Sequence, residues 1–461
     1  MPATTASSRR TSPAGRAPAA DPRAAAAAET AGQRARDAAR AEVTRPPGSP
    51  DFAALLHQDP EIAGVLLAES GRQSDGLQLI AAENFVSPAV LAALGSPLGN
   101  KYAEGYPGAR HHAGCEIVDL AERIAVERAK ALFGAEHANV QSHSGSSAVL
   151  AAYAALLRPG DTVLALSLRD GGHLTHGSPA NFSGRWFDFA GYGVDPASGR
   201  LDYEAIRALA LERRPKALVC GSISYPRHID YAAFRDIADE TGAYLIADVA
   251  HPMGLIAGHA APSPVPYADV VCATTHKVLR GPRGGMILCR ARLAERIDRA
   301  VFPFTQGGAQ MNAVAAKAVA FAEAATPAFR AYAQQVVANA RALADGLAAQ
   351  GLTVTTGGTD THLITADTAP LGLDARTARG RLAAAGIVLD TCALPSAKPP
   401  AGAACPTGIR LGSAAVTTQG MGEAEMHRIA ELIGAALRED GAVRAAIAGL
   451  VGRFPPYPDQ D

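Results

Sequence analysis

The chain has little cysteine and no long apolar run. Its six cysteines contain no CxxC pair, and they stand at positions 115, 220, 272, 289, 392 and 405. Such scattered cysteines predict buried thiols of a reducing compartment, with neither a disulfide framework nor a metal site. No uninterrupted apolar stretch reaches the roughly 20 residues that a membrane-spanning helix needs, and the apolar core of a secretory signal is absent. We therefore expect a soluble, cytoplasmic protein.

An excess of charge of one sign is also lacking. Lys and Arg together number 43 and Asp and Glu together 44, so the formal net charge is −1. No overall field favours nucleic acid or an anionic membrane, and we expect neither as a partner. Hydrophobic residues make up 48% of the 461 residues, which is enough for a large core. At roughly 100–200 residues per domain, two or three domains are expected.

Residues 1–50 differ in composition from the rest of the chain. They are rich in Ala, Pro, Ser, Thr and Arg and hold few large apolar side chains, which predicts a disordered extension. The lack of acidic residues before Asp21 also has a faint likeness to an organelle transit peptide. Residues 51–100 read as an N-terminal arm, and from Phe52 to Asn84 the pattern is helical and then extended. We place the boundary between a large domain (101–326) and a smaller C-terminal α/β domain (327–461) near Pro327.

Apolar strands and amphipathic helices alternate through the large domain. Helices are expected at Cys115–Leu132 and Ser146–Leu157, and strands at His137–Gln141, Thr162–Leu166 and Lys216–Cys220. This alternation is typical of a largely parallel sheet covered on both faces. Two helices are expected between Asn312 and Leu347. Beyond Gly351 the candidates are strands at Leu352–Thr356, His362–Ala366 and Gly386–Leu389 and a helix at Glu423–Leu437.

Two strand ends carry a carboxylate and an amine. The run Tyr244–Asp248 ends in Asp248, and the next strand leads through Thr274 to Lys277, 29 residues further along (277 − 248). A lysine can bond to the aldehyde of pyridoxal phosphate while a carboxylate keeps the pyridine nitrogen protonated. Many α/β proteins carry a Lys and an Asp at strand ends, so this spacing alone is weak.

Four further motifs have a chemical and an ordinary structural interpretation. Ser144-Gly145-Ser146 between a strand and a helix suits a phosphate cradle, or an ordinary helix N-cap. His173, in the glycine-rich loop 171–177, suits stacking on a planar cofactor, or a polar loop. Arg410 between glycines suits a substrate carboxylate, or a surface salt bridge. Glu104 between two tyrosines suits a general acid or base, or a solvated loop.

Taken together and in this order, the motifs resemble the serine hydroxymethyltransferase (glycine hydroxymethyltransferase) family of fold-type I pyridoxal-phosphate enzymes. The likeness runs from the Leu79–Phe85 segment to the C-terminal helix, and it includes the loops 101–108, 144–146, 171–177, 248–251 and 274–285 and the Arg410 strand. It implies an α/β fold, with a mostly parallel sheet in a large domain that binds pyridoxal phosphate and a smaller C-terminal α/β domain.

The resemblance also implies roles for individual residues around the cofactor. Lys277 would bind it covalently, Asp248 would pair with the pyridine nitrogen, His173 would stack on the ring, and His251 would reach its phenolic oxygen. The phosphate would be held by Ser144, Gly145, Ser146 and His276, joined from the neighbouring subunit of a homodimer or homotetramer by Gly307, Gly308 and Tyr102.

On the substrate side, the resemblance assigns Arg410 to the carboxylate and Glu104 to proton transfer at the hydroxymethyl group. His112 would lie near the substrate, and Arg283 and Thr274 would support the lysine. The implied reaction is the transfer of the hydroxymethyl group of serine to tetrahydrofolate, which leaves glycine and belongs to one-carbon metabolism.

Departures from the family pattern concern substrate and folate rather than pyridoxal phosphate. They are His111, His112, Ala82, Ile223 and Ser396, where the family usually has aromatic or polar residues. They leave open a threonine or β-hydroxy-amino-acid aldolase, a transaldolase, or an α-methylserine hydroxymethyltransferase. A non-catalytic descendant that uses its arginine-rich tail for interaction is the alternative from another class.

Overall fold

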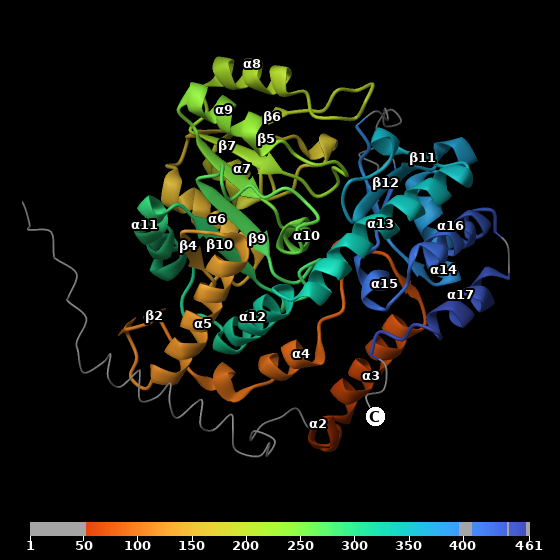
Figure 1. Ribbon diagram of the computed structural model, residues 1–461, viewed down its shortest axis with the longest axis horizontal. Coiled ribbons are helices and arrows are strands. Elements are labelled where there is room, and N and C mark those ends of the chain that lie inside the picture. Colours follow the sequence, from red (N-terminus) through yellow and green to blue (C-terminus); the bar gives the residue numbers. More distant parts are fainter. Residues whose placement is uncertain (1–51, 396–407, 440–441, 458–461) are drawn as a thin grey trace, which may run out of the picture.

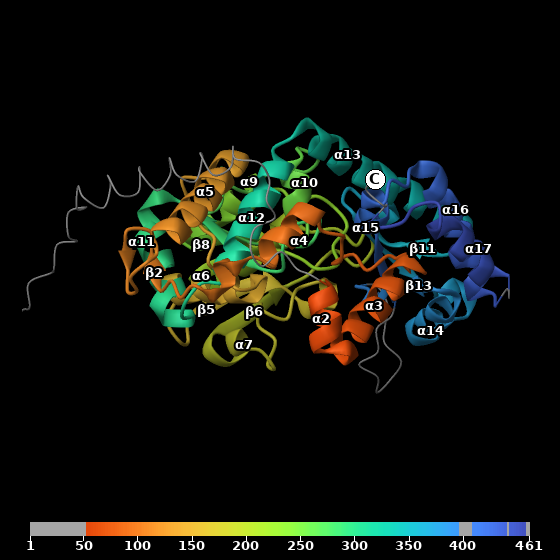
Figure 2. The same cartoon turned by 90° about the horizontal axis from the view of Figure 1, so that it is seen from below.

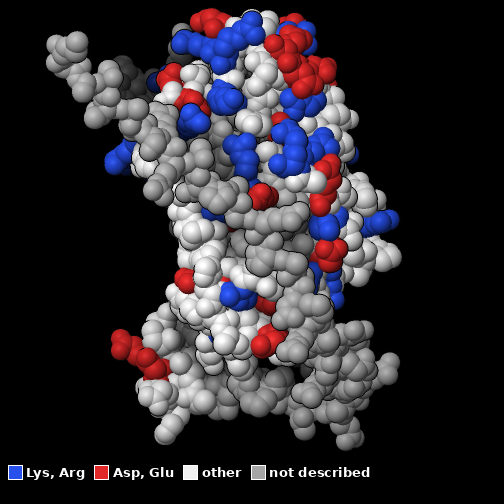
Figure 3. Space-filling view, turned by 90° about the vertical axis from the view of Figure 1, so that its left-hand side faces the viewer, with Lys and Arg blue, Asp and Glu red and all other residues white. Residues whose placement is uncertain are grey.

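The computed structural model describes residues 52–395, 408–439 and 442–457. Figure 1 shows two lobes, a larger one built on a central sheet and a smaller one that carries the C-terminal helices. The expected extension before residue 51, Ser396 and Cys405 lie outside the described residues. Among the described residues, no helix is long and apolar enough to cross a membrane. On the face shown in Figure 3, basic and acidic side chains are interspersed.

The N-terminal arm connects the two lobes. It comprises α2 (Phe52–Gln58), α3 (Pro60–Ser74), β1 (Leu77–Gln78) and α4 (Pro88–Leu94), and Figure 2 shows α4 beside α12. Asp59 caps α3 by accepting a hydrogen bond from the amide of Ile62 at 3.0 Å. β1 pairs in parallel with β13 (Ile387–Val388) of the small lobe. The prediction of a helical and then extended arm is confirmed.

The large lobe holds a seven-stranded sheet in the order β4-β10-β9-β8-β7-β5-β6. Its strands are β4 (His137–Asn139), β5 (Thr162–Leu166), β6 (Asp188–Tyr192), β7 (Ala217–Gly221), β8 (Tyr244–Asp248), β9 (Val270–Thr274) and β10 (Gly285–Cys289). Only β10 runs against its neighbours, so the predicted mostly parallel sheet is confirmed. β7, β9 and β10 are buried throughout, which explains their continuous apolar sequences.

Helices lie on both faces of this sheet (Figure 1). They are α5 (Glu116–Phe133), α6 (Gly145–Leu156), α7 (Phe182–Trp186), α8 (Tyr203–Arg213), α9 (Tyr231–Thr241), α10 (Met253–Ala257), α11 (Ala294–Arg299) and α12 (Met311–Ala324). Asp202 and Asp230 cap α8 and α9 through two backbone amides each. Four of the cysteines, at 115, 220, 272 and 289, are buried free thiols, as predicted, while Cys392 is partly exposed.

The small lobe begins with the long helix α13 (Pro327–Ala349), whose N-cap is Thr326. A four-stranded antiparallel sheet, β11-β12-β15-β14, follows. Its strands are β11 (Thr353–Val354), β12 (Leu363–Asp367), β14 (Asp390–Cys392) and β15 (Gly408–Gly412), and its helices are α14 (Ala375–Ala385), α15 (Ala414–Thr418), α16 (Glu423–Leu437) and α17 (Val443–Val451). The helix predicted at Glu423–Leu437 is α16.

Two strand predictions in this lobe were wrong in extent. The candidate at Leu352–Thr356 shrinks to β11, because the chain turns at Thr356, whose φ is +57°. The candidate at Gly386–Leu389 shrinks to β13, because it pairs with only the two residues of β1. The strands β6, β10 and β14 were not predicted.

Candidate active site

The carboxyl ends of the parallel strands open into a cavity of about 420 Å³ between the lobes. In open α/β sheets this edge is where ligands bind. The cavity brings together most of the residues singled out from the sequence, namely Ser144, Gly145, Ser146, His173, Asp248, His251, Thr274, His276, Lys277, Arg283 and Arg410. Ile80, Ala82 and Glu83 of the arm, together with Ile223, complete much of the wall.

Lys277 is a buried amine at the start of the loop after β9. Burial lowers its pKa to about 8, with Arg410 and Arg283 acting in the same direction and Asp248 against them. The side-chain amide of Asn84 donates to the carbonyl of Lys277 at 3.1 Å. An amine with this pKa is substantially uncharged just above neutral pH, which is the form that attacks a carbonyl carbon.

Asp248 is held by a buried chain of hydrogen bonds. His176 Nε2 lies 2.9 Å from Asp248 Oδ2, and His176 Nδ1 lies 2.7 Å from the hydroxyl of Tyr153. Burial alone would raise the pKa of Asp248, but His176, the amide of Ala250 and Lys277 outweigh it and leave that pKa below its ordinary value. Asp248 is therefore ionised at neutral pH. The sequence assigned no role to His176 or Tyr153; the spacing His173-x-x-His176 after a strand was the available signal.

The loop at the start of α6 is open to the cavity and tightly packed behind. Ser144 caps α6 by accepting from the amide of Ser147 at 3.0 Å, so the N-cap interpretation is confirmed. A Cβ atom at Gly145 would lie 2.6 Å from Thr274 Cγ2, and one at Gly285 would lie 2.2 Å from the carbonyl oxygen of Ser144. The hydroxyls of Ser144 and Ser147 are used in capping the helix, and the amides at the start of α6 suit an anion.

Lys317, which the sequence did not indicate, lies beneath this loop. Its Nζ donates to the carbonyl oxygens of Val140 at 2.6 Å, Ser142 at 3.0 Å and Gly285 at 2.8 Å. Val140 and Ser142 follow β4 and Gly285 is the first residue of β10, so Lys317 joins the segment after β4 to the start of β10. Its burial lowers its pKa to about 7.

His173, His251 and His276 of the cavity, and His362 behind His251, are neutral imidazoles at ordinary pH. Burial lowers the pKa of His173, whose Nδ1 lies 2.6 Å from Thr175 Oγ1. His251 and His362 stack at 16°, with Nδ1 and Nε2 3.2 Å apart. Burial lowers the pKa of both, to about 3 for His362, and burial with nearby Arg283 lowers that of His276 to about 3. Uncharged rings of this kind suit stacking and hydrogen bonding rather than ion pairing.

Arg410 reaches the cavity from β15. Its Nη1 donates to the carbonyl of Ile223 at 2.8 Å, and its Nη2 lies 2.7 Å from Asp390 Oδ2. The sequence left two interpretations of Arg410, a carboxylate-binding residue and a salt-bridged one. The salt bridge is present, and the residue also lines the cavity.

Tyr102, Glu104, His112, Gly307 and Gly308 form a second cluster that does not line the cavity. A Cβ at Gly307 would lie 3.4 Å from Glu104 Oε1, and one at Gly308 would lie 3.6 Å from Tyr102 Cε1. His112 Nε2 is 3.4 Å from Glu104 Oε2, and its ring meets Tyr102 edge-on at 4.9 Å. The Tyr102 side chain is 60% exposed. Within one chain, these residues therefore lie apart from Lys277.

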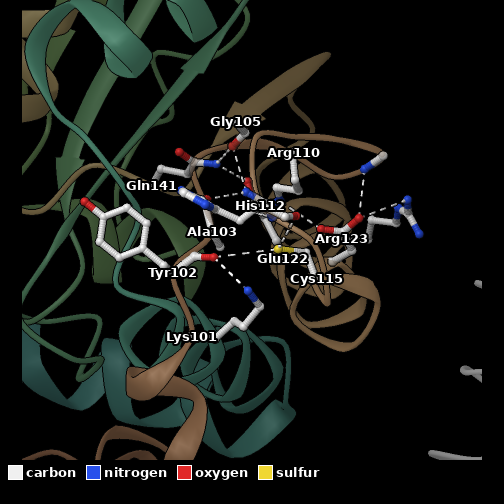
Figure 4. Close-up of polar contacts among 12 residues, drawn as sticks. Lys101, Tyr102, Ala103, Gly105, Arg110, His112, Cys115, Glu122, Arg123 and Gln141 are labelled. Carbon is white, nitrogen blue, oxygen red and sulfur yellow. Dashed lines mark hydrogen bonds and ion pairs between the residues drawn. The ribbon is translucent and has the colours of Figure 1, made fainter.

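The loop that carries this cluster is held from behind by Arg110. The Arg110 guanidinium binds Asp119 and Glu122 and donates to the carbonyls of Ala103 and Gly105. In Figure 4 the ring of Tyr102 points away from this network. A buried, fully satisfied network of this kind keeps the loop rigid while its tip faces outward.

A model of the serine hydroxymethyltransferase family matches residues 55–433. The chain belongs to this family. Its sheet and two lobes agree with the fold-type I architecture that the family has. Enzymes of the family use pyridoxal phosphate, and the cavity fits that group: it offers a buried amine beside an ionised carboxylate, and a helix N-terminus backed by Gly145 and Gly285.

Proposed function

We propose that this protein transfers the hydroxymethyl group of serine to tetrahydrofolate, leaving glycine. The observation that carries the proposal is the meeting of Lys277, Asp248 and Arg410 in one cavity of a family member. An amine, an ionised carboxylate and a guanidinium there suit pyridoxal phosphate together with an α-amino acid.

Pyridoxal phosphate supplies an electron sink for the cleavage of a bond at the Cα atom of an amino acid. In our proposal, Lys277 holds the cofactor, and Ser144, Gly145 and Ser146 bind its phosphate. Asp248, ionised beside His176, keeps a proton on the pyridine nitrogen. His173, which lines the cavity, would lie against the ring.

The second cluster, which does not line the cavity, supports a site shared between two copies of the chain. Tyr102, Glu104, Gly307 and Gly308 lie together but apart from Lys277, with Tyr102 exposed. We propose that they complete the cavity of a second copy in a homodimer or homotetramer, where Glu104 handles the proton of the substrate hydroxyl. Exposed apolar side chains at Ile117, Ile124 and Phe304 fit such a contact.

Mixing two inactive variants tests the shared site. Lys277→Ala and Glu104→Gln proteins, each inactive alone, should after subunit exchange recover about a quarter of the wild-type activity, because about half of the dimers are mixed and each mixed dimer has one intact site. No recovery, with exchange verified by mass spectrometry, would place both residues in the site of one chain.

A folate-independent aldolase, transaldolase or α-methylserine enzyme is the second candidate. Ala82 and Ile223 add apolar surface to the cavity wall, which suits a substrate with an extra methyl group. His112 stands beside Glu104 as a further proton-carrying group.

Glycine formation from serine, measured with and without tetrahydrofolate, decides between the candidates. The proposal expects turnover that depends on tetrahydrofolate, and a change in cofactor absorbance when tetrahydrofolate is added to the protein with glycine. Equal turnover without tetrahydrofolate, or faster cleavage of threonine or α-methylserine, would favour the second candidate. Lys277→Ala is the inactive control.

A further inference from the structure

Asp390 stands directly opposite Arg410 in the small-lobe sheet. β14 and β15 are antiparallel, and their register pairs the two residues. Directly opposite residues project from the same face of a sheet, and here the side chains meet at 2.7 Å. The Arg410 side chain is 12% exposed and that of Asp390 is 35% exposed. A carboxylate of the protein is therefore bound to the guanidinium that lines the cavity.

The donors of Arg410 are unevenly used. Nη1 donates to Ile223 and Nη2 to Asp390, whereas Nε is buried without a hydrogen-bond partner. A carboxylate binds arginine bidentately through two parallel N–H groups, and both such edges of a guanidinium include one Nη2 hydrogen. Asp390 therefore takes one of the two Nη2 hydrogens and offsets part of the guanidinium charge that an incoming carboxylate would meet, while Nε is a donor without an acceptor.

A second acidic residue lines the same cavity as Arg410. Glu83 lines the cavity from the arm. Burial raises its pKa, and Asp390 raises it further, against the opposite influence of Arg72 and Arg283. The Asp390 carboxylate therefore acts electrostatically on a second acidic group of the cavity as well as on Arg410.

We propose that Asp390 competes with the substrate carboxylate for Arg410 and so sets the affinity of this protein for α-amino acids. The inference rests on the proposed function only in taking an α-amino acid as the ligand of Lys277 and Arg410. While Asp390 is bound to Arg410, an amino-acid carboxylate meets a guanidinium whose charge is already partly balanced. The competition weakens the binding of every ligand that relies on an α-carboxylate. It does not affect the binding of a ligand that has no carboxylate.

Asp390→Asn tests the competition, because it removes the charge and keeps the shape. Glycine is titrated into the pyridoxal-phosphate-loaded protein and followed by the absorbance of the bound cofactor. The Kd for glycine should fall about tenfold, whereas the Kd for glycinamide, which lacks the carboxylate, should not fall. Asp390→Ser is a second neutral variant and should give the same gain.

The matched control is Asp360→Asn. Asp360 pairs with Arg227 at 3.0 Å between the two lobes, with side chains 27% and 13% exposed, and neither residue lines the cavity. The glycine Kd of this variant should equal that of the wild type. An equal gain in Asp360→Asn would attribute the effect to looser lobes and overturn the proposal.

Unchanged or weaker glycine binding in folded Asp390→Asn and Asp390→Ser proteins would also overturn it, and would make Asp390 a residue that orients Arg410. Failure of the proposed function would look different. Glycine would then bind more tightly to Asp390→Asn, but turnover of serine would not depend on tetrahydrofolate. That combination would refute the folate assignment and leave the role of Asp390 intact. A wild-type protein that shows no response to glycine would overturn both.

Discussion

Replacing His176 by Phe should uncouple Asp248 from the only side chain that hydrogen-bonds to it among the described residues. The His176 side chain is 2% exposed, so Phe would occupy the same space without a donor. Two buried groups then lose a partner, the carboxylate of Asp248 and the hydroxyl of Tyr153. The pKa of Asp248 should rise, because burial is no longer outweighed by His176.

The size of the effect follows from these two contacts. A hydrogen bond to a charged group contributes about 1.5–3 kcal/mol, and a buried polar group left unsatisfied costs about 1–3 kcal/mol. The free energy of unfolding should therefore fall by about 2–6 kcal/mol at neutral pH. Tyr153→Phe, which leaves the His176–Asp248 bond in place, should cost only about 1 kcal/mol. The side-chain amide of His176→Gln can donate to Asp248, so its loss in free energy of unfolding should lie between those of His176→Phe and Tyr153→Phe.

The pH dependence gives a signature that simple loss of packing lacks. In the wild type, the pKa of Asp248 lies below its ordinary value, so its stabilising contribution is present at neutral pH and is lost as the pH falls through the acid range. In His176→Phe that contribution is already missing. The difference in free energy of unfolding between the wild type and His176→Phe should therefore narrow as the pH falls.

Urea unfolding of the cofactor-free proteins, at several pH values from about 7 down to about 3, a range that includes the ordinary aspartate pKa of about 3.9, measures this difference. Cofactor affinity supplies a second readout, because a protonated Asp248 cannot hold the pyridine nitrogen in its protonated form. A stability loss that is independent of pH, or a His176→Phe protein as stable as Tyr153→Phe, would refute the reasoning.

Three further results are expected. Gly145→Ala should weaken pyridoxal phosphate binding by about 1–3 kcal/mol, because the added Cβ would lie 2.6 Å from Thr274 Cγ2. Binding is measured by fluorescence titration. The control Gly64→Ala, whose Cβ would have nothing within 4 Å, should leave the affinity unchanged. Lys317→Met should destabilise the protein by about 2–5 kcal/mol in urea, since three buried carbonyls lose a donor, whereas Lys130→Met, which breaks an exposed pair, should cost under about 0.5 kcal/mol. The rate at which cofactor-free protein captures pyridoxal phosphate should rise with pH to about 8, where Lys277 loses its proton, and then level off; a rise that continued to the ordinary lysine pKa of 10.5 would contradict the buried setting.

Much of the fold and half of the site were predictable from local sequence. Short apolar runs bounded by polar residues predicted β5 and β8, and the spacing of apolar residues predicted α16 with its observed ends. Asp248 and Lys277 come directly after such runs, so their meeting at one sheet edge follows from parallel strand order alone. These features depend on residues close together in the chain, where sequence periodicity is informative.

The partners of those residues were decided only by the tertiary structure. Asp248 meets His176 across 72 residues of chain, and Lys317 meets the carbonyl of Val140 across 177. The pairing of Asp390 with Arg410 depends on the register of two short antiparallel strands, and a shift of one residue would put Asp390 on the other face of the sheet. Local propensity determines which segments become strands and helices. Which charged groups face one another depends on packing and strand register, because the partners come from segments far apart in the chain. A local sequence pattern carries no information about such pairs.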